Sequence, residues 1–422
     1  MINVAIIGVG TVGQSVVNIL EKNRDIISAR AGKEIRVTKG IVRDLSKKRD
    51  VNIPLSDNVD DVLNDDSIDI IVELMGGVDE PFDVVKKALS KNKAVVTANK
   101  ALLAYHRYEL QNIAKNLPIG FEASVAGGIP IINALREGLS ANHIEAIMGI
   151  LNGTCNYMLT KMANDGVAFD EVLKEAQELG YAEADPTFDI GGFDAAHKLL
   201  ILASIAYGID AKPEDILIEG IENINQNDIK FAKEFGYSIK LLAIAKKIRN
   251  EVELRVHPVL IKNNKMISKV DGVMNGISVI GDCVGETMYY GPGAGGDATA
   301  SAVISDIIEI SRVGQSSPML GFKRAMEESN LKLLSLDKIE SKYYLRMSVA
   351  NELGVLAQIS KVFAQNDISI DAVLQRPTDK DSVALLLFST HKCNEMKMKN
   401  ALEILENHDV IKDKIAMIRI ED

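Results

Sequence analysis

The sequence predicts a multidomain α/β protein: a parallel N-terminal sheet, an α+β middle region and a small C-terminal module. Short, continuously apolar segments alternate with helical patterns up to about residue 130, which is typical of a parallel sheet covered on both faces. Helical patterns then dominate, and residues 343–422 follow the order βαββαβ of a ferredoxin-like module. The 422 residues also exceed what one hydrophobic core usually holds.

The N-terminal elements are predicted from apolar runs and helical periodicity. Strands are expected at Asn3–Ile7, Ile35–Val42, Asp69–Leu74, Ala94–Thr97 and Pro118–Phe121, and helices at Gln14–Leu20 and Asp83–Leu89. Because each strand is apolar throughout, we expect both faces of this sheet to be buried.

The middle region and the C-terminal module continue the chain. Middle helices are expected at Ile131–Gly138, Asn156–Asp165, Phe169–Leu179, Phe193–Tyr207 and Thr299–Val313, with strands at Lys240–Ala245, Glu251–His257 and Gly276–Gly281 and a glycine loop at Gly291–Gly296. In the module, strands are expected at Tyr344–Ala350, Ser369–Leu374, Ser382–Thr390 and Ile411–Ile420, and helices at Gly354–Gln365 and Met396–Glu406. Residues 315–341 resemble a connector with one charged helix. The predicted domains are therefore residues 1–130, 131–320 and 343–422, with a linker at 321–342.

Composition excludes several classes of function. Lys and Arg number 48 and Asp and Glu 59, a net charge of −11, which disfavours nucleic acid and anionic membranes as partners. The three cysteines are widely separated, which fits a reducing, cytoplasmic protein without disulfides. We expect no signal peptide and no membrane span, because there is no apolar run of about 18 residues. Without an H-E-x-x-H motif, a catalytic zinc site is not expected.

A G-x-G-x-x-G motif follows the first strand and opens the first helix. In this context the motif predicts a Rossmann-like dinucleotide-binding domain, because free backbone N–H groups at the helix start can bind a pyrophosphate. The candidate cofactor contacts in the motif are Gly8, Gly10, Thr11, Val12 and Gly13.

The end of the second strand selects between NAD and NADP. An acidic residue there would bind the ribose 2′-OH, whereas an arginine suits a 2′-phosphate. The strand ends at Val42, and Arg43 and Asp44 follow as competing candidates. Arg43 favours NADP(H), with NAD(H) use possible. The basic residues at positions 47–49 are either further phosphate contacts or a solvated charge run.

Eight separated motifs resemble those of homoserine dehydrogenases. They are G-V-G-T-V-G from Gly8, V-E-L-M-G-G from Val72, T-A-N-K-A from Thr97, F-E-A-S-V-A-G-G-I-P from Phe121, N-G-T-C-N-Y from Asn152, G-Y-A-E-A-D-P from Gly180, D-I-G-G-F-D-A-A-H-K from Asp189 and G-P-G-A-G-G-D-A-T-A from Gly291. Together they span about residues 1–315. The C-terminal module resembles an ACT domain through N-E-L-G-V-L-A-Q-I at Asn351–Ile359.

The resemblance implies NAD(P)-dependent interconversion of L-homoserine and L-aspartate 4-semialdehyde, a step toward threonine and methionine. The attached ACT domain implies an amino-acid effector, for which threonine is the favoured candidate, bound near Asn351–Leu356. We also expect the module to help the chain dimerise, giving a homodimer or homotetramer, because pairing covers open edge strands.

Aldehyde reduction needs a proton donor at the carbonyl oxygen, and a lysine in a partly dry site can serve. By resemblance Lys198 is this donor. Lys100 lies just past the fourth strand, where ligands bind in open α/β sheets, and is expected to touch the cofactor or the substrate oxygen. Asp194 lies four residues before Lys198, hence on the same helix face, and would orient Lys198 or hold substrate. Taken alone, that spacing is more typical of a surface ion pair.

The remaining site residues are also carried over from the resemblance. Glu183 would bind the substrate ammonium, while Asp185 and Asp189 are expected to cap loops. Further cofactor contacts fall on Lys100, Gly180 and Gly295. A monovalent cation, usually sodium, would lie at Glu122, Val125, Gly127 and Ile129, where backbone carbonyls can supply oxygen ligands.

Two other functions stay open from the sequence. Cys155 could be the nucleophile of another semialdehyde-handling NADP oxidoreductase, such as an aspartate-semialdehyde dehydrogenase. No His or other activator stands beside it, so a small buried residue is favoured. A non-catalytic amino-acid sensor is the second alternative, and the complete set of Lys100, Glu183, Asp194 and Lys198 argues against it.

Overall fold

The structure is a computed structural model that describes residues 1–313, 318–323, 331–377 and 382–421. Contacts divide the chain into two compact units. The first comprises Met1–Gly153, Asp194–Ile216 and Val273–Leu331, and the second comprises Thr154–Phe193, Leu217–Gly272 and Lys332–Asp422. Residues 315–317 and 324–330 of the expected connector lie outside the described residues.

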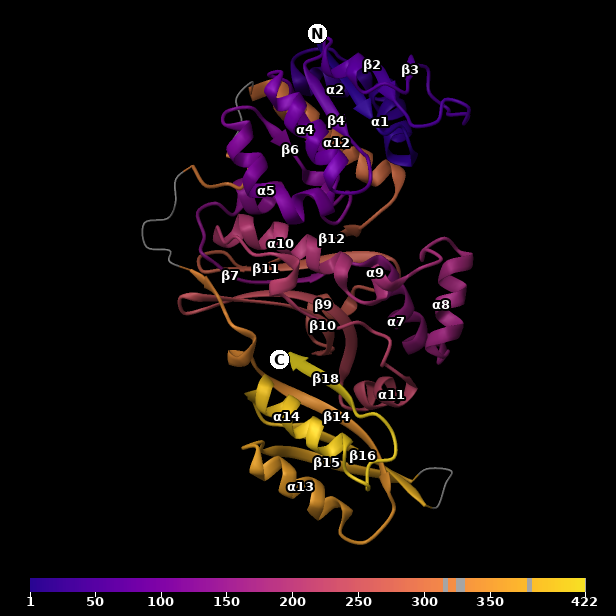
Figure 1. Cartoon of the computed structure of the whole chain (residues 1–422), viewed down its shortest axis with the longest axis vertical. Helices are drawn as coiled ribbons and strands as arrows, with labels where there is room; N and C mark the ends of the chain where they lie inside the picture. Colours follow the sequence, from indigo (N-terminus) through magenta and orange to yellow (C-terminus); the bar gives the residue numbers. More distant parts are fainter. Residues whose placement is uncertain (314–317, 324–330, 378–381, 422) are drawn as a thin grey trace. The chain divides into compact units, whose positions relative to one another are not determined.

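The first unit is built on a six-stranded sheet with the order β3-β2-β1-β4-β5-β6 (Figure 1). The strands are β1 (Ile2–Ile7), β2 (Ile35–Ile41), β3 (Leu55–Ser56), β4 (Ile70–Glu73), β5 (Ala94–Thr97) and β6 (Ile119–Gly120), and every pairing is parallel. This is the doubly wound order of dinucleotide-binding domains, and it confirms the predicted parallel sheet.

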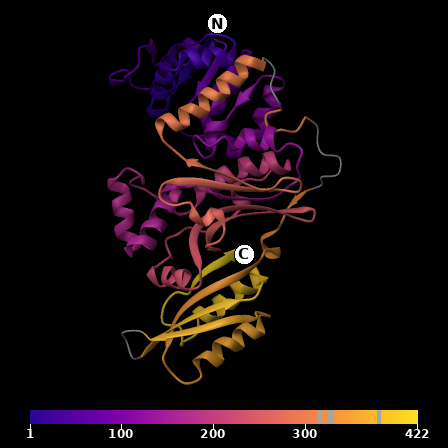
Figure 2. The ribbon, with the colours of Figure 1, turned by 180° about the vertical axis from the view of Figure 1, so that it is seen from behind.

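Helices join and cover these strands. They are α1 (Thr11–Lys22), α2 (Arg24–Ala31), α3 (Asp60–Leu63), α4 (Asp79–Ser90) and α5 (Lys100–Ala114). Of these helices, α2, α3 and α5 were not predicted from the sequence. A further helix, α12 (Gly296–Val313), comes from far along the chain and lies against α1 (Figures 1 and 2). Its residues Ala300, Val303 and Ile307 share a core cluster with Val4 and Val16, so this helix completes the N-terminal core.

The rest of the first unit contains a three-stranded antiparallel segment and the helix α10 (Phe193–Tyr207). The strands are β7 (Ile144–Ile150), β11 (Met274–Gly281) and β12 (Gly285–Pro292), paired β7-β11-β12. Neither β7 nor β12 was predicted, and Gly291 and Pro292 belong to β12 rather than to a loop. The helix predicted over Ile131–Gly138 begins as α6 (Ile131–Asn133) but continues as a π-helical turn (Ala134–Gly138), in which Leu139 N–H donates to the Ala134 carbonyl at 2.7 Å.

The second unit contains a mixed sheet with the path β9-β10-β18-β14-β16-β15. Its strands are β8 (Leu217–Ile218), β9 (Tyr237–Ile248), β10 (Glu251–Lys262), β13 (Lys332–Leu333), β14 (Glu340–Ala350), β15 (Ile370–Pro377), β16 (Val383–Thr390), β17 (Cys393–Asn394) and β18 (Ala416–Glu421). Its helices are α7 (Gly153–Asp165), α8 (Phe169–Glu178), α9 (Thr187–Ile190), α11 (Gln226–Glu234), α13 (Val355–Gln365) and α14 (Glu395–Glu406). The order β14-α13-β15-β16-α14-β18 confirms the predicted βαββαβ module. The last strand is shorter than the predicted Ile411–Ile420.

The last strand of the C-terminal module, β18, also pairs with a strand outside the module. β18 pairs in parallel with β10, with Val259 opposite Arg419 and Ile261 opposite Glu421. One edge of the module is therefore covered by the same chain, and β15 ends the path at the other edge. The expectation that the edge strands of the module are open is wrong for β18, because its partner strand β10 lies about 160 positions away in the sequence.

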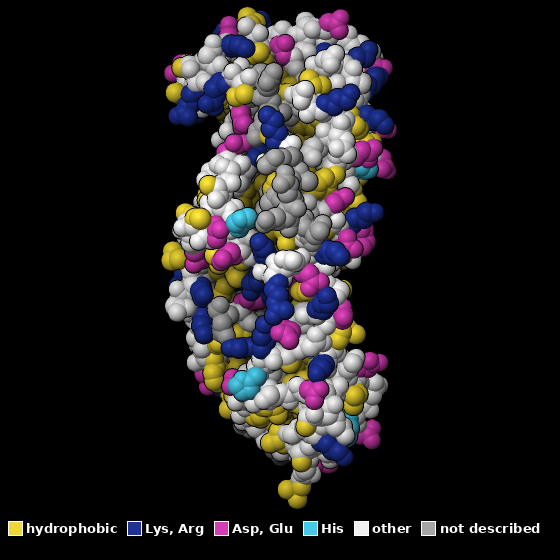
Figure 3. Space-filling model, turned by 90° about the vertical axis from the view of Figure 1, so that its left-hand side faces the viewer, with side chains coloured by type: hydrophobic (Ala, Val, Ile, Leu, Met, Phe, Trp, Pro, Cys, Tyr) yellow, Lys and Arg dark blue, Asp and Glu magenta, His cyan; other side chains and the backbone are white. Residues whose placement is uncertain are grey.

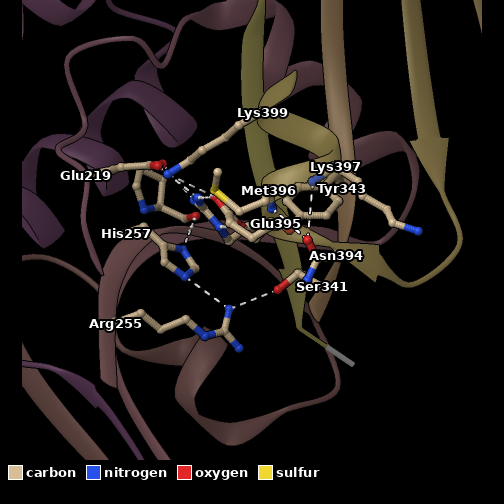
Figure 4. Close-up of polar contacts among 12 residues, drawn as sticks. Glu219, Arg255, His257, Ser341, Tyr343, Asn394, Glu395, Met396, Lys397 and Lys399 are labelled. Atoms are coloured by element: carbon tan, nitrogen blue, oxygen red, sulfur yellow. Dashed lines mark hydrogen bonds and ion pairs between the residues drawn. The ribbon is translucent and has the colours of Figure 1, made fainter. Parts of the chain in front are cut away.

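Buried ion pairs accompany this pairing (Figure 4). The Arg419 side chain is 1% exposed and donates to Glu219 at 2.7 and 2.8 Å and to Glu395 at 3.0 Å. The Tyr343 hydroxyl donates to Glu395 at 2.7 Å. Although burial opposes it, hydrogen bonds from Arg419 lower the pKa of Glu395, while burial and the charge of Arg419 lower the pKa of the fully buried His257 well below 6.5. Arg419 and Glu395 at this junction are therefore buried charges, whereas the Glu219 side chain remains 32% exposed.

Lys and Arg side chains are interspersed with Asp and Glu on the face drawn in Figure 3. Among the described residues, each helix is too short or too polar to traverse a bilayer.

Candidate active site

The glycine loop between β1 and α1 has the geometry that a pyrophosphate requires. Gly8 has a φ of 102°, and a Cβ there would lie 2.5 Å from the Leu74 carbonyl oxygen. A Cβ on Gly13 would lie 2.5 Å from the Gly8 carbonyl oxygen, whereas one on Gly10 would meet no described atom within 4 Å. The outer glycines thus allow tight packing, and the central one leaves the backbone open to a ligand. Thr11 and Val12 begin α1 at this opening.

The end of β2 carries both candidate ribose contacts. The Arg43 side chain is 82% exposed and pairs with Glu80 on α4 at 2.8 Å. Asp44 accepts hydrogen bonds from the backbone and hydroxyl of Ser46, and these lower the pKa of Asp44. Arg49, which the sequence analysis left undecided, donates to the carbonyls of Val9 and Asp44 at 2.9 and 2.8 Å. Arg49 therefore braces the glycine loop, whereas Arg43 is exposed and ion-paired with Glu80.

Asp194 holds both candidate lysines in one cluster, in which Lys198 is buried and Lys100 is 36% exposed. The Asp194 side chain is 3% exposed; Oδ2 accepts from Lys198 Nζ at 2.7 Å, and Oδ1 lies 2.5 Å from Lys100 Nζ. Burial alone would raise the pKa of Asp194, but the charges of Lys198 and Lys100 outweigh it and hold this pKa well below its usual range. The pair Asp194–Lys198 is therefore not the surface ion pair that its spacing alone suggests.

Separate elements bring these lysines together. Lys100 is the first residue of α5, whose start is fixed because Asn99 accepts from the Leu102 backbone N–H at 3.0 Å. Asp194 and Lys198 lie one turn apart on α10, which is buried along nearly its whole length. The carboxylate therefore links the carboxyl edge of the parallel sheet to the buried helix.

Two further groups hold this cluster and were missed from the sequence. The Asn152 side chain donates to Asp194 Oδ2 at 2.9 Å, and the Leu151 carbonyl accepts from Lys198 Nζ at 2.7 Å. Both follow β7, a strand that the sequence analysis did not predict. The motif N-G-T-C-N-Y pointed to this segment but not to its contact with Lys198.

The proposed cation turn is buried and rich in backbone oxygens. Ala126 and Gly127 both have positive φ, and a Cβ on Gly127 would lie 2.7 Å from the Gly293 carbonyl oxygen. The Glu122 carboxylate accepts from the backbone N–H groups of Ile132 and Asn133, each at 2.8 Å. Its side chain is thus turned to the helix start. A monovalent cation at this turn would depend on the backbone carbonyls, of which that of Ile129 already accepts from the Ile131 N–H at 2.8 Å and offers its second lone pair. Burial raises the pKa of Glu122 to about 7.

Gly180, Glu183 and Cys155 belong to the second unit. Gly180 has a φ of 75°, and Glu183 is exposed, with its carbonyl accepting from Gln177 at 3.1 Å. Asp185 accepts from Thr187 at 2.7 Å and so caps its loop as expected. Cys155 is fully buried, and its thiol donates to the Asp189 carbonyl at 3.2 Å, which supports a packing role rather than a nucleophile. Gly295, in the first unit, has a φ of 119° and directly precedes α12.

A doubly wound sheet, an open glycine loop and a cluster of two lysines on one buried carboxylate define a dehydrogenase that uses a nicotinamide dinucleotide. Sequence profiles described as "Homoserine dehydrogenase" and "Homoserine dehydrogenase, NAD binding domain" match residues 130–308 and 8–118, and an "ACT domain" profile matches residues 343–409. The chain belongs to the homoserine dehydrogenase family.

Known proteins are similar over the full length. The chain is 58% identical to homoserine dehydrogenase of Helicobacter pylori over 421 residues, covering 100% of this chain and 99% of that protein. It is 44% identical to the enzyme of Neisseria gonorrhoeae, with 100% and 98% covered. The crystal structure of a homoserine dehydrogenase from Thiobacillus denitrificans has a TM-score of 0.94 at 44% identity and covers 100% of this chain and 98% of that one. A hyperthermophilic archaeal homoserine dehydrogenase in complex with NADPH covers 77% of this chain at 29% identity, with a TM-score of 0.62.

Proposed function

We propose that this homoserine dehydrogenase prefers NADP(H) and uses Lys198 as the proton donor and acceptor at the substrate oxygen. The observation that carries the assignment is the bridge of Asp194 between Lys198 and Lys100. Nicotinamide, when bound, supplies or takes the hydride. Lys198 gives its proton to the developing alkoxide in reduction and takes it back in oxidation, while Lys100, held on the same carboxylate as Lys198, stabilises the oxygen's negative charge.

Steady-state oxidation of L-homoserine with NADP and with NAD, each with and without threonine, tests this proposal. We expect turnover with both cofactors and a higher kcat/KM with NADP. The reverse reaction, reduction of L-aspartate 4-semialdehyde, is measured in the same way with the reduced cofactors. Equal kcat/KM values for the two cofactors would contradict the NADP preference.

We expect Arg43→Ala to weaken NADP much more than NAD. The exposed guanidinium can leave Glu80 and bind a 2′-phosphate, a charge-assisted contact that NAD cannot make. A loss of about 10-fold or more in kcat/KM for NADP is consistent with one such bond. Arg24→Ala, which removes another exposed ion-paired arginine, is the matched control. Equal losses for NAD and NADP would assign Arg43 to the adenine or to the fold.

Glu183 is proposed to bind the substrate ammonium, so Glu183→Gln should mainly raise KM for homoserine. The carboxylate interacts with the ammonium equally in the ground and transition states, and its loss therefore affects binding more than kcat. Because Glu183 is exposed in this structure, the substitution should not unfold the chain. Glu178→Gln, on the preceding helix, serves as the control. An unchanged KM would refute the assignment.

A sodium ion at the turn of Glu122, Val125, Gly127 and Ile129 is part of the proposal. The turn packs against Gly293 at the start of the late glycine loop, so an ion there would order both segments. The ion would fix the conformation of these two segments and would take no part in the hydride or proton transfer.

Threonine is proposed as the effector of the ACT domain, with the α-carboxylate received at the start of α13. Gly354 has a φ of 83° and precedes this helix, whose first N–H groups have no carbonyl partner within the helix. Calorimetry on the full chain should detect L-threonine, and the rate of homoserine oxidation should change with it. Inhibition requires that threonine bind one conformational state more tightly than another.

Leu353→Asp should abolish the threonine effect, because its negative charge would repel the carboxylate. Leu353 is fully exposed, so the substitution costs little stability, and Ile404→Asp on α14 is the control. If the wild-type chain neither binds threonine nor responds to it, the feedback role is refuted. Removing the module is a poor test, because deleting β18 would uncover β10 and leave Glu219 without Arg419.

We also propose that the chain forms a homodimer or homotetramer. The strand β15 is the edge of the module that is available for this contact.

The proposed domains are residues 1–130, 131–320 and 343–422. The helix α12 belongs to the second of these by sequence, but it packs in the core of the first.

A further inference from the structure

Asn275 shares a hydrogen-bond acceptor with Lys198. It lies on β11, is 1% exposed, and its Nδ2 donates to the Leu151 carbonyl at 3.1 Å. The same oxygen accepts from Lys198 Nζ at 2.7 Å, so the two nitrogens lie at most 5.8 Å apart. None of the family motifs identified from the sequence includes Asn275.

The orientation of the Asn275 amide is fixed by this contact. A carbonyl oxygen can only accept, so the NH₂ group must face Leu151 and Oδ1 must face the other way. None of the residues that the structure describes donates a hydrogen bond to this buried Oδ1. Buried acceptors in native proteins normally have a donor, which indicates that a bound molecule supplies it.

Two glycines lie beside the Asn275 amide. A Cβ on Gly293 would lie 2.1, 2.2 and 2.3 Å from its Cγ, Nδ2 and Oδ1, and one on Gly153 would lie 3.8 Å from Oδ1. Gly293 begins the loop that leads to Gly296, where a Cβ would meet Ser15 and Thr11 of the glycine-loop helix. Asn275 thus lies between the Lys198 cluster and a loop that runs to the proposed pyrophosphate site.

We infer that Asn275 is a ligand-binding and positioning residue of the dehydrogenase: its N–H group holds the Leu151 carbonyl that anchors Lys198, and its Oδ1 accepts a hydrogen bond from an N–H or O–H group of the bound substrate or cofactor. The inference rests on the proposed role of Lys198. Without Asn275, the carbonyl would be free to turn and the Lys198 ammonium would lose a fixed partner.

Asn275→Asp and Asn275→Leu separate the two halves of this role. The aspartate keeps Oδ1 but removes the N–H donor and adds a carboxylate near Lys198. A carboxylate favours the ammonium form of Lys198, so the pH profile of kcat should move upward by about one unit or more. In the direction of oxidation, kcat should fall about 10-fold or more at neutral pH.

Asn275→Leu removes both contacts at similar side-chain volume. It should lower kcat and raise KM, for homoserine if the substrate donates to Oδ1 or for NADP if the cofactor does.

Ser278→Ala is the matched control. Ser278 lies on the same strand and is 2% exposed, but its hydroxyl donates to Glu286 instead. This variant should keep the kcat and pH profile of the wild type. If it loses as much activity as the Asn275 variants, the losses come from damage to β11 and the inference is wrong.

The inference is also overturned if both Asn275 variants keep kcat, both KM values and the pH profile within twofold of the wild type. If the leucine variant does not fold, the near-isosteric aspartate variant and its pH profile decide. The activity of the wild type in the same assay distinguishes failure of the proposed function from failure of the role of Asn275. An inactive wild type refutes the proposed function, whereas an active wild type with unaffected Asn275 variants refutes only the role of Asn275.

Discussion

Lys198→Ala is expected to lower kcat for homoserine oxidation by about 10² to 10⁴, the usual span for the loss of an acid–base group. The methyl group can neither take the hydroxyl proton nor return it. The variant should fold, because Asp194 keeps Lys100 at 2.5 Å and Asn152 at 2.9 Å, so no buried carboxylate is left unpaired. Steady-state kinetics with saturating NADP, together with circular dichroism to verify the fold, measures this effect.

Lys198→Arg separates proton transfer from simple charge. The guanidinium keeps the positive charge but does not release its proton at accessible pH. If Lys198 transfers a proton, the arginine variant should be nearly as slow as the alanine variant. Near-normal kcat in Lys198→Ala at neutral pH would remove Lys198 from the mechanism, and high activity in Lys198→Arg alone would reduce its role to electrostatics.

Arg419→Met should destabilise the second unit by about 3–5 kcal/mol, the usual cost of removing one partner from a buried ion pair. The guanidinium is 1% exposed and pairs with both Glu219 and Glu395. Its loss leaves the Glu395 carboxylate, which is 1% exposed, without its buried cation. Urea unfolding followed by circular dichroism should show the transition of this unit at lower urea concentration.

Two controls make the Arg419 result specific. Arg376→Met breaks an exposed ion pair with Glu234, and we expect it to cost less than about 1 kcal/mol. Adding Glu395→Gln to Arg419→Met should recover part of the lost stability, because one unpaired charge is then removed. If Arg419→Met costs no more than Arg376→Met, the junction between β10 and β18 does not depend on this pair.

Local patterns in the sequence were sufficient for the glycine loop, the C-terminal module and five of the six strands of the N-terminal sheet, but not for the two-residue strand β3. The strand Ala94–Thr97 and the helix Phe193–Tyr207 have the predicted bounds. Their apolar runs and periodicity depend on neighbouring residues only. The strand β7 was missed because its buried side chains do not alternate regularly, and α12 was assigned to the wrong core because its partners are almost 300 residues away.

The candidate site also has some features that the sequence predicts and others that depend on tertiary structure. The spacing of Asp194 and Lys198 alone places them on one helix face, and the glycine motif alone predicts an open backbone at Gly10. Tertiary structure decided that this helix is buried, that Lys100 reaches the same carboxylate, and that Leu151 and Asn275 complete the surroundings of Lys198. The sequence determines which groups are available and how near neighbours along the chain lie. Burial and pairing between distant segments set the charge state and the partners of those groups, and both arise only when the whole chain packs.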